Sequence, residues 1–146
     1  MLCNVDLLAT LAALTGTDIE PGQATDSYNR RPALTGTPAE PIRDYMRICP
    51  SSRKHLSIRK GHWIYIPAQN SGGFDGQEIG LHHFGGAASH KLTHRPNSDI
   101  ENGKIKEDAP PAQLYNLKDA PHETTTVIRQ YPDIPEEHTP RLKTKL

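Results

Sequence analysis

The first strong pattern of apolar and polar positions lies near the start of the chain, over Val5–Leu14. Two overlapping stripes have helical spacing, one of Val5, Leu8 and Ala12 and one of Leu7, Leu11 and Leu14. The pattern predicts a helix that is apolar around most of its circumference and needs burial on more than one side. Asn4 or Asp6 is expected to cap its start, and Thr15-Gly16 to end it.

The clearest strand signal is Leu56–Ile66, which predicts a hairpin. With Lys60-Gly61 as a two-residue turn, Ile58 faces Trp63 and Leu56 faces Tyr65. This register places Leu56, Ile58, Trp63 and Tyr65 on one apolar face. The opposite face is mixed and holds Ser57, Arg59, His62, Ile64 and Ile66.

The remaining segments are short or irregular. Frequent Gly, Pro, Asp and Asn predict an irregular connection over Thr17–Glu40. Strands are expected at Tyr45–Cys49 and Gln113–Leu117. Pro67–Ala112 loses periodicity and is expected to be a long loop, either mobile or lining a site completed elsewhere. Glu123–Tyr131 fits a helix of about two turns that later prolines prevent from extending.

Composition indicates one domain with little to bury. Of 146 residues only 34% are hydrophobic, whereas ordinary globular chains contain about 45–50%. Such a chain is expected to fold poorly alone, so a partner domain is plausible. The 17 basic residues balance the 17 acidic ones, which argues against a nucleic-acid surface.

Neither a membrane span nor a signal peptide is expected. No apolar run approaches the ~20 residues that cross a bilayer, and Met1–Leu14 contains no basic residue. Cys3 and Cys49 are too few for a disulfide framework, and two free thiols are favoured over a pair. The compartment is left open.

Candidate chemistry is sparse. The histidines at 82, 83, 90 and 94 invite a metal interpretation, but neighbouring glycines and Pro96 argue against a helix that would align His90 with His94. Solvated loop histidines are the favoured interpretation. There is no Gly-x-Ser-x-Gly elbow and no phosphate-binding glycine motif. We therefore assign no catalytic, cofactor-binding or metal-binding residue to this chain.

Three separated segments resemble the C-terminal region of arylsulfatase-type sulfatases, which depend on formylglycine and calcium. They are Val5–Gly16 with Asp26-Ser27 and Pro32–Gly36; Ile58–Ile66, similar to the family's Ile-Arg-x-Gly-x-Trp-Lys-Tyr-Ile; and Gln113–Leu117 with Asp119, Pro121, Glu123 and Thr124. The sequence departs from the family at Ile64, usually lysine, at Ala120, usually aspartate, and at Thr126, commonly asparagine. Prolines after Tyr131 replace what is usually a longer terminal helix.

The resemblance implies an α+β fold, a small antiparallel sheet with flanking helices and the irregular loop 67–112. Residues 1–40 would form a junction helix and connection from a catalytic domain, and residues 41–146 the C-terminal subdomain. The family's nucleophile motif is Cys or Ser, any residue, Pro, any residue, Arg. Cys49–Arg53 misplaces the proline and Ala39–Arg43 begins with alanine, so neither qualifies.

The first functional hypothesis is therefore a C-terminal fragment of a sulfuric ester hydrolase that is inactive alone. Formylglycine and calcium would belong to the missing catalytic domain, which is the expected partner, and self-association is expected in its absence. The family is often periplasmic, secreted or lysosomal. The alternative is a small standalone binding module derived from that subdomain, using the loop 67–112 and its histidines. A histidine-based metal carrier is weaker.

Overall fold

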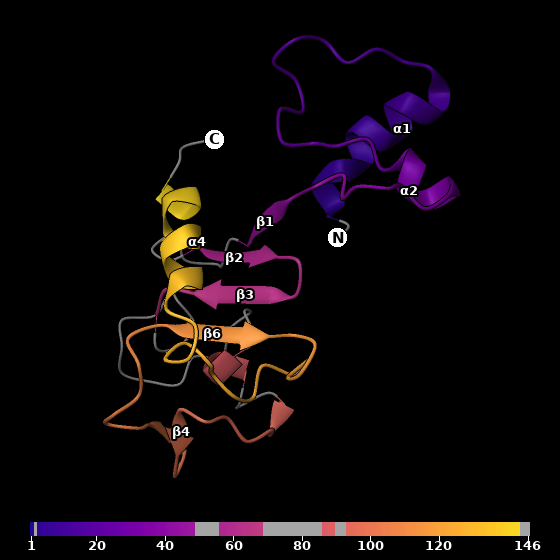
Figure 1. Ribbon diagram of the computed structural model, residues 1–146. Helices are drawn as coiled ribbons and strands as arrows, with labels where there is room; N and C mark the ends of the chain where they lie inside the picture. Colours follow the sequence, from indigo (N-terminus) through magenta and orange to yellow (C-terminus); the bar gives the residue numbers. More distant parts are fainter. Residues whose placement is uncertain (2, 49–55, 69–85, 90–92, 144–146) are drawn as a thin grey trace. The chain divides into compact units, whose positions relative to one another are not determined.

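The structure is a computed structural model that describes residues 1, 3–48, 56–68, 86–89 and 93–143. The chain divides into two compact units, Met1–Asp44 and Tyr45–Lys145. The first holds helices and the second an antiparallel sheet with a helix, so the expected α+β class is confirmed (Figure 1). None of the helices in the described ranges has the length and apolar character that a membrane span requires.

The first unit begins with the predicted helix. A 3₁₀ turn, η1 (Asn4–Asp6), leads into α1 (Leu7–Thr15). Gly16 then adopts the left-handed conformation, with φ of 69°, and ends the helix as predicted. The predicted side-chain cap is wrong, because no side chain caps either turn and the Asp6 carboxylate is used elsewhere. A short helix, α2 (Arg31–Thr35), interrupts the connection predicted as irregular.

Helix α1 presents its large apolar side chains to solvent and its small or polar ones to its own unit. Leu7, Leu8, Leu11 and Leu14 are each more than half exposed. Asp6 and Thr10 are buried instead. The burial that the apolar pattern demands is therefore not supplied by the described residues of this chain.

The second unit is built on a four-stranded antiparallel sheet of order β1-β2-β3-β6. Its strands are β1 (Tyr45–Ile48), β2 (Ser57–Lys60), β3 (Trp63–Ile66) and β6 (Gln113–Asn116). The strands predicted at Tyr45–Cys49 and Gln113–Leu117 are confirmed over these bounds, and Cys49 lies outside the described residues.

The predicted hairpin register is wrong by two residues. Ile58 faces Tyr65 and Lys60 faces Trp63, so the turn is Gly61-His62. Gly61 has a φ of 57° and takes the first central position, where a type II′ turn needs glycine. The predicted turn would have put Lys60 at that position. A shift of two residues keeps each side chain on its face, so the predicted apolar grouping is retained.

Both faces of the sheet carry an apolar cluster. On one face Ile58, Tyr65 and Leu114 are buried, and the half-buried Trp63 packs against them. On the face predicted as mixed, Ile64, Ile66 and Tyr115 are buried. A sheet covered on both sides explains how a chain of low apolar content still forms a core.

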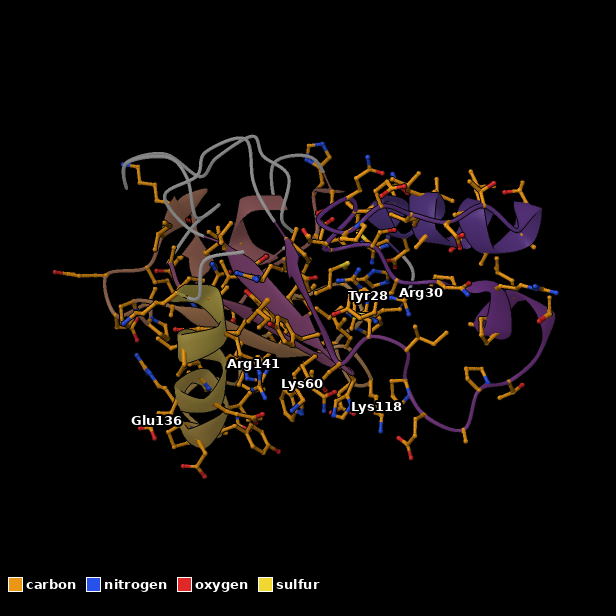
Figure 2. The ribbon with its side chains drawn as sticks, turned by 90° about the horizontal axis from the view of Figure 1, so that it is seen from above. Tyr28, Arg30, Lys60, Lys118, Glu136 and Arg141 are labelled. Carbon is orange, nitrogen blue, oxygen red and sulfur yellow. The ribbon has the colours of Figure 1, made fainter. Side chains whose placement is uncertain are left out.

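The C-terminal helix α4 (Asp133–Lys143) covers the Ile58 face, and Ile134 and Leu142 pack against that cluster. Glu137 of α4 binds two cations through Oε1, Lys60 of β2 and Arg141 of the same helix, each at 2.7 Å, and both are labelled in Figure 2.

Two helix predictions fail at the C-terminus. Glu123–Tyr131 contains turns but no helix, and α4 forms where prolines were expected to prevent one. Pro135 lies in the first turn, where a helix has no backbone bond to lose. Pro140 lies inside the helix, in the last turn before it ends at Lys143. Burial of the helix on the sheet offsets the bond lost at Pro140.

The segment predicted as a long loop contains ordered pieces. A 3₁₀ turn, η2, spans Gly86–Ser89, and a two-stranded sheet joins β4 (Ile100–Glu101) to β5 (Lys104–Ile105). Asn102 and Gly103 form its turn with φ of 51° and 73°. Asn-Gly is the strongest short hairpin signal in a sequence, and the prediction of a long loop over Pro67–Ala112 is wrong at this hairpin.

Candidate functional site

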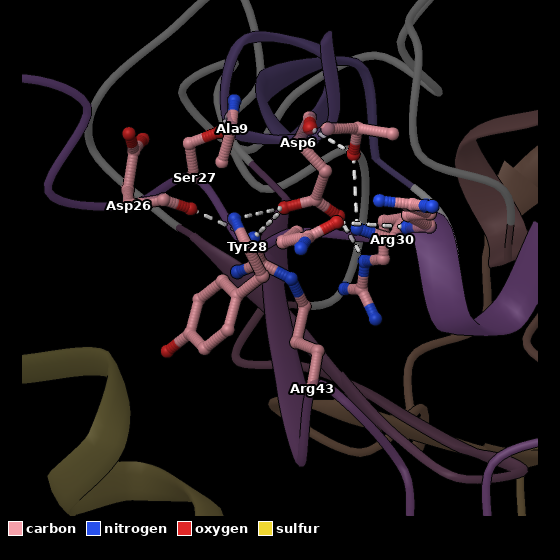
Figure 3. Close-up of polar contacts among 10 residues, drawn as sticks. Asp6, Ala9, Asp26, Ser27, Tyr28, Arg30 and Arg43 are labelled. Atoms are coloured by element: carbon pink, nitrogen blue, oxygen red, sulfur yellow. Dashed lines mark hydrogen bonds and ion pairs between the residues drawn. The ribbon is translucent and has the colours of Figure 1, made fainter. Parts of the chain in front are cut away.

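Among the described residues, three groups of polar side chains are largely buried, and each is centred on a carboxylate or an amide. In the first unit, Asp6 Oδ2 accepts a bond from Arg30 Nε at 2.7 Å, and Asp6 Oδ1 binds Arg43 Nη2 (Figure 3). The backbone N–H of Tyr28 adds a third bond, to Oδ1 at 3.1 Å. One carboxylate therefore connects η1 to two distant parts of its unit.

Electrostatics favour the charged form of Asp6. Burial of the carboxyl raises its pKa, but the hydrogen bonds from Arg43 and Arg30 outweigh burial and lower the pKa to about 2. Arg43 also stacks on the Tyr28 ring, with its guanidinium carbon 4.3 Å from the ring centre. Figure 2 places Tyr28 and Arg30 together in this unit. Because two arginines bind Asp6 and keep it ionised, the cluster joins segments of the chain and does not transfer protons.

In the second unit, the Gln113 network lies on the Ile64 face of the sheet. Gln113 Oε1 accepts from the Ala87 N–H at 3.0 Å and from the Tyr115 hydroxyl at 2.7 Å. Gln113 Nε2 donates to the Ala68 carbonyl at 2.7 Å. Asn97 Nδ2 donates to the Tyr115 hydroxyl at 3.2 Å. Burial raises the pKa of Tyr115, so its hydroxyl stays protonated as a donor.

Glu123 lies beside this network, and the pKa of its carboxyl is unusually high. Burial raises the pKa of its carboxyl to about 7, although a bond from the Gly86 backbone and the charge of Arg59 oppose the shift. Its Oε2 is buried and has no hydrogen-bond partner among the described residues. The pKa of an acid or base catalyst is often displaced in this way, but so is that of a desolvated structural group. No nucleophile with a neighbouring base accompanies Glu123 in the described part of the chain.

The third group surrounds a cavity of about 230 Å³, which we call the Asp99 cavity. Its polar lining includes Asp99, Ser98, Lys106, Asp108, Thr126 and Arg129. Asp99 is only 3% exposed, and its Oδ1 accepts a bond from Ser98 Oγ at 2.9 Å. Burial raises the pKa of Asp99, while the charges of Lys106 and Arg129 oppose that shift. This group therefore borders a space that can hold a small ligand.

The residues that the sequence singled out are not brought together by the described structure. His94 is exposed, and His82, His83 and His90 lie outside the described residues, as does Cys49–Arg53. Among the described residues, no three or more His, Cys, Asp or Glu side chains converge on a point that could hold a metal ion. Arg43, from the near-miss segment Ala39–Arg43, instead binds Asp6.

Sequence reasoning missed the buried acids Asp6 and Asp99 and the half-buried Glu123. The partners of Asp6 lie far along the chain, at Arg30 and Arg43, so no local spacing marks them. The burial of Asp99 and Glu123 likewise depends on tertiary packing. The Asn102-Gly103 turn was the one local signal near the cavity, because the hairpin it forms lies between Asp99 and Lys106 in the sequence.

Comparison with known proteins gives a fold likeness. The sequence matches no protein-family profile and no curated protein. A solved structure of similar fold is a sulfatase from Bacteroides thetaiotaomicron, labelled 6S-sulf and described with the metabolism of multiple glycosaminoglycans. The TM-score is 0.55 at 24% sequence identity, and the match covers 94% of this chain and 23% of that one. The chain therefore has the fold of a segment of a sulfatase, and spans under a quarter of that protein's length.

Proposed function

We propose that this chain is the C-terminal region of a formylglycine- and calcium-dependent sulfatase and does not cleave sulfuric esters by itself. One observation carries the proposal. The fold likeness spans nearly the whole chain but only 23% of the sulfatase. The three segments that resemble the family coincide with α1, with the hairpin of β2 and β3, and with β6.

The chemistry of the reaction supports an inactive chain. Cleavage of a sulfate ester needs a nucleophile, a cation to offset charge on the sulfuryl oxygens, and an acid for the leaving group. The sequence has no Cys-x-Pro-x-Arg or Ser-x-Pro-x-Arg motif from which formylglycine could be made. Calcium needs several converging oxygens, and the buried Asp6 is already bound by two arginines.

The surface of α1 supports a partner domain. Its exposed leucines form an apolar surface of the kind that commonly marks a docking site for another protein or domain. In the proposed enzyme this surface is covered by the catalytic domain.

The test is an assay of the purified chain with a chromogenic aryl sulfate, with and without calcium. We expect turnover equal to the buffer blank in both conditions. Turnover that disappears in the Cys49→Ala variant would overturn the proposal, because Cys49–Arg53 would then be a genuine nucleophile site.

The genomic neighbourhood gives an independent check. We expect the coding sequence immediately upstream to encode a Cys-x-Pro-x-Arg or Ser-x-Pro-x-Arg motif. An unrelated neighbour and a separate promoter would instead favour a small standalone binding module.

A further inference from the structure

The Asp99 cavity lies within the second unit, next to the turn-forming segment that follows the β4–β5 hairpin. Its volume of about 230 Å³ is ample for a molecule of several non-hydrogen atoms, because a single water needs only about 10–15 Å³. No residue of the Asp6 cluster or of the Gln113 network lines it.

The Asp99 carboxylate is incompletely bonded. Ser98 Oγ donates to Oδ1, whereas Oδ2 is buried and has no hydrogen-bond partner among the described residues. A buried charged oxygen without a donor is costly, so nearly all such groups in folded proteins have a partner. The missing partner of Asp99 is a hydrogen-bond donor, and because Asp99 lines the cavity, a ligand bound there can supply that donor.

Positively charged side chains line the same cavity as Asp99. Lys106 and Arg129 both line it. Arg129 Nη2 donates to the Asp108 carbonyl at 2.5 Å, which holds the guanidinium at the cavity and uses one of its five N–H donors. The Lys106 N–H donates to the Asp99 carbonyl at 2.9 Å, which fixes the start of that side chain. The cavity thus presents an acceptor and two cationic donors to one small volume.

We propose that this cavity binds a small zwitterion of the amino-acid class. Its ammonium group donates to Asp99 Oδ2, and its carboxylate accepts from Arg129 and Lys106. The charges of Asp99, Asp108, Lys106 and Arg129 cancel, so a ligand with no net charge leaves the site neutral while satisfying both signs. A plain anion would leave Asp99 without its donor, and a plain cation would leave the two basic side chains without an acceptor.

The experiment follows backbone amide resonances of the full chain during titration with glycine, acetate, methylammonium and glycerol. We expect glycine to shift the resonances of Asp99, Lys106 and Thr126 with a dissociation constant on the order of 1 mM. Acetate and methylammonium should each bind about tenfold or more weakly, because each lacks one charge-assisted bond.

Variants separate the two ends of the ligand. Asp99→Asn should weaken glycine binding about tenfold and leave acetate binding unchanged, and Arg129→Gln should weaken both. Lys118→Gln removes an exposed cation that does not line the cavity and should change neither. Arg129 is exposed, so its variant remains informative even if Asp99→Asn fails to fold.

Three results would overturn the proposal. Acetate that binds as tightly as glycine would make the cavity an anion site. Glycerol that binds as tightly would make it a polyol site. Amide resonances that none of the four probes moves would show that the cavity holds only water.

Discussion

At the scale of single residues, the buried Asp6 and Asp99 and the half-buried Glu123 differ because their surroundings differ. Two arginines bind Asp6, a serine hydroxyl binds one oxygen of Asp99, and Glu123 has a buried oxygen with no described partner. The pKa of Asp6 is therefore lowered to about 2, whereas the pKa of Glu123 is raised to about 7.

Removing the charge of Asp6 should unfold the first unit locally. Asp6→Asn leaves the cations of Arg30 and Arg43 buried without their anion, which typically costs roughly 3–5 kcal/mol. We expect the α1 amides to lose protection in hydrogen exchange. Asp18→Asn makes the same change at an exposed position and should leave that protection unaltered. Equal protection in the two variants would show that the cluster contributes no stability.

Glu123 should make the second unit more stable in mild acid than at neutral pH. Its pKa is about 7 in the folded chain and near 4.5 in the unfolded chain, so between these values the folded state binds more protons. Stability therefore falls as the pH rises through this window, by about 3 kcal/mol in total. Urea unfolding from pH 4.5 to 7 measures it.

The matched variant isolates that contribution. Glu123→Gln is neutral at every pH and should remove this slope, whereas Glu101→Gln, at an exposed position, should keep it. A slope that survives in Glu123→Gln would assign it to other groups.

At the scale of elements, two glycines with nearly the same backbone conformation have different surroundings. Gly61 in the hairpin turn has φ of 57° and nothing within 4 Å of an added Cβ. Gly86 at the start of η2 has φ of 58°, and an added Cβ would lie 2.5 Å from Gln113 Oε1. The backbone strain of an alanine is thus the same at both sites, and only the packing differs.

Gly61→Ala should cost about 1 kcal/mol, the ordinary penalty of a left-handed non-glycine residue. Gly86→Ala should cost more than this by roughly 1–3 kcal/mol, because it also displaces the buried Gln113 amide. Chemical denaturation of both variants gives the difference directly. Equal losses would mean that Gln113 can move aside without cost.

Sequence patterns predicted elements whose causes are local and missed those whose causes are distant. Helix α1 and strand β6 follow from apolar spacing, and Gly16 marks the end of its helix. The hairpin faces were predicted correctly, but the register was not, because the first central position of the turn belonged to Gly61. Helix α4 was missed because tertiary burial outweighs the prolines. The Asp99 cavity could not be predicted, since it joins residues that only the fold brings together.

At the scale of the whole molecule, the exposed leucines of α1 should make the isolated chain self-associate. Leu8 and Leu11 are 57% and 55% exposed. The double variant Leu8→Ser, Leu11→Ser should lower light scattering at a given concentration, because it removes apolar surface that drives association. Thr17→Ser, at an exposed position, should scatter like the unaltered chain. Scattering that is unchanged in the double variant would place the association surface elsewhere.

The position of β6 in the sheet has a consequence for synthesis on the ribosome. Ile66 of β3 pairs with Gln113 of β6, so the sheet cannot be completed until a long stretch of chain has been made after the hairpin. Closing a loop of that length costs about 3–4 kcal/mol in chain entropy. Until β6 is made, strands β1, β2 and β3 lack Leu114 and Tyr115, which are buried in the two apolar clusters. Leu142, which helps to cover the Ile58 face, emerges later still. The second unit can therefore complete its core only after α4 has been made, by which time α1, which precedes it in the chain, has already left the ribosome.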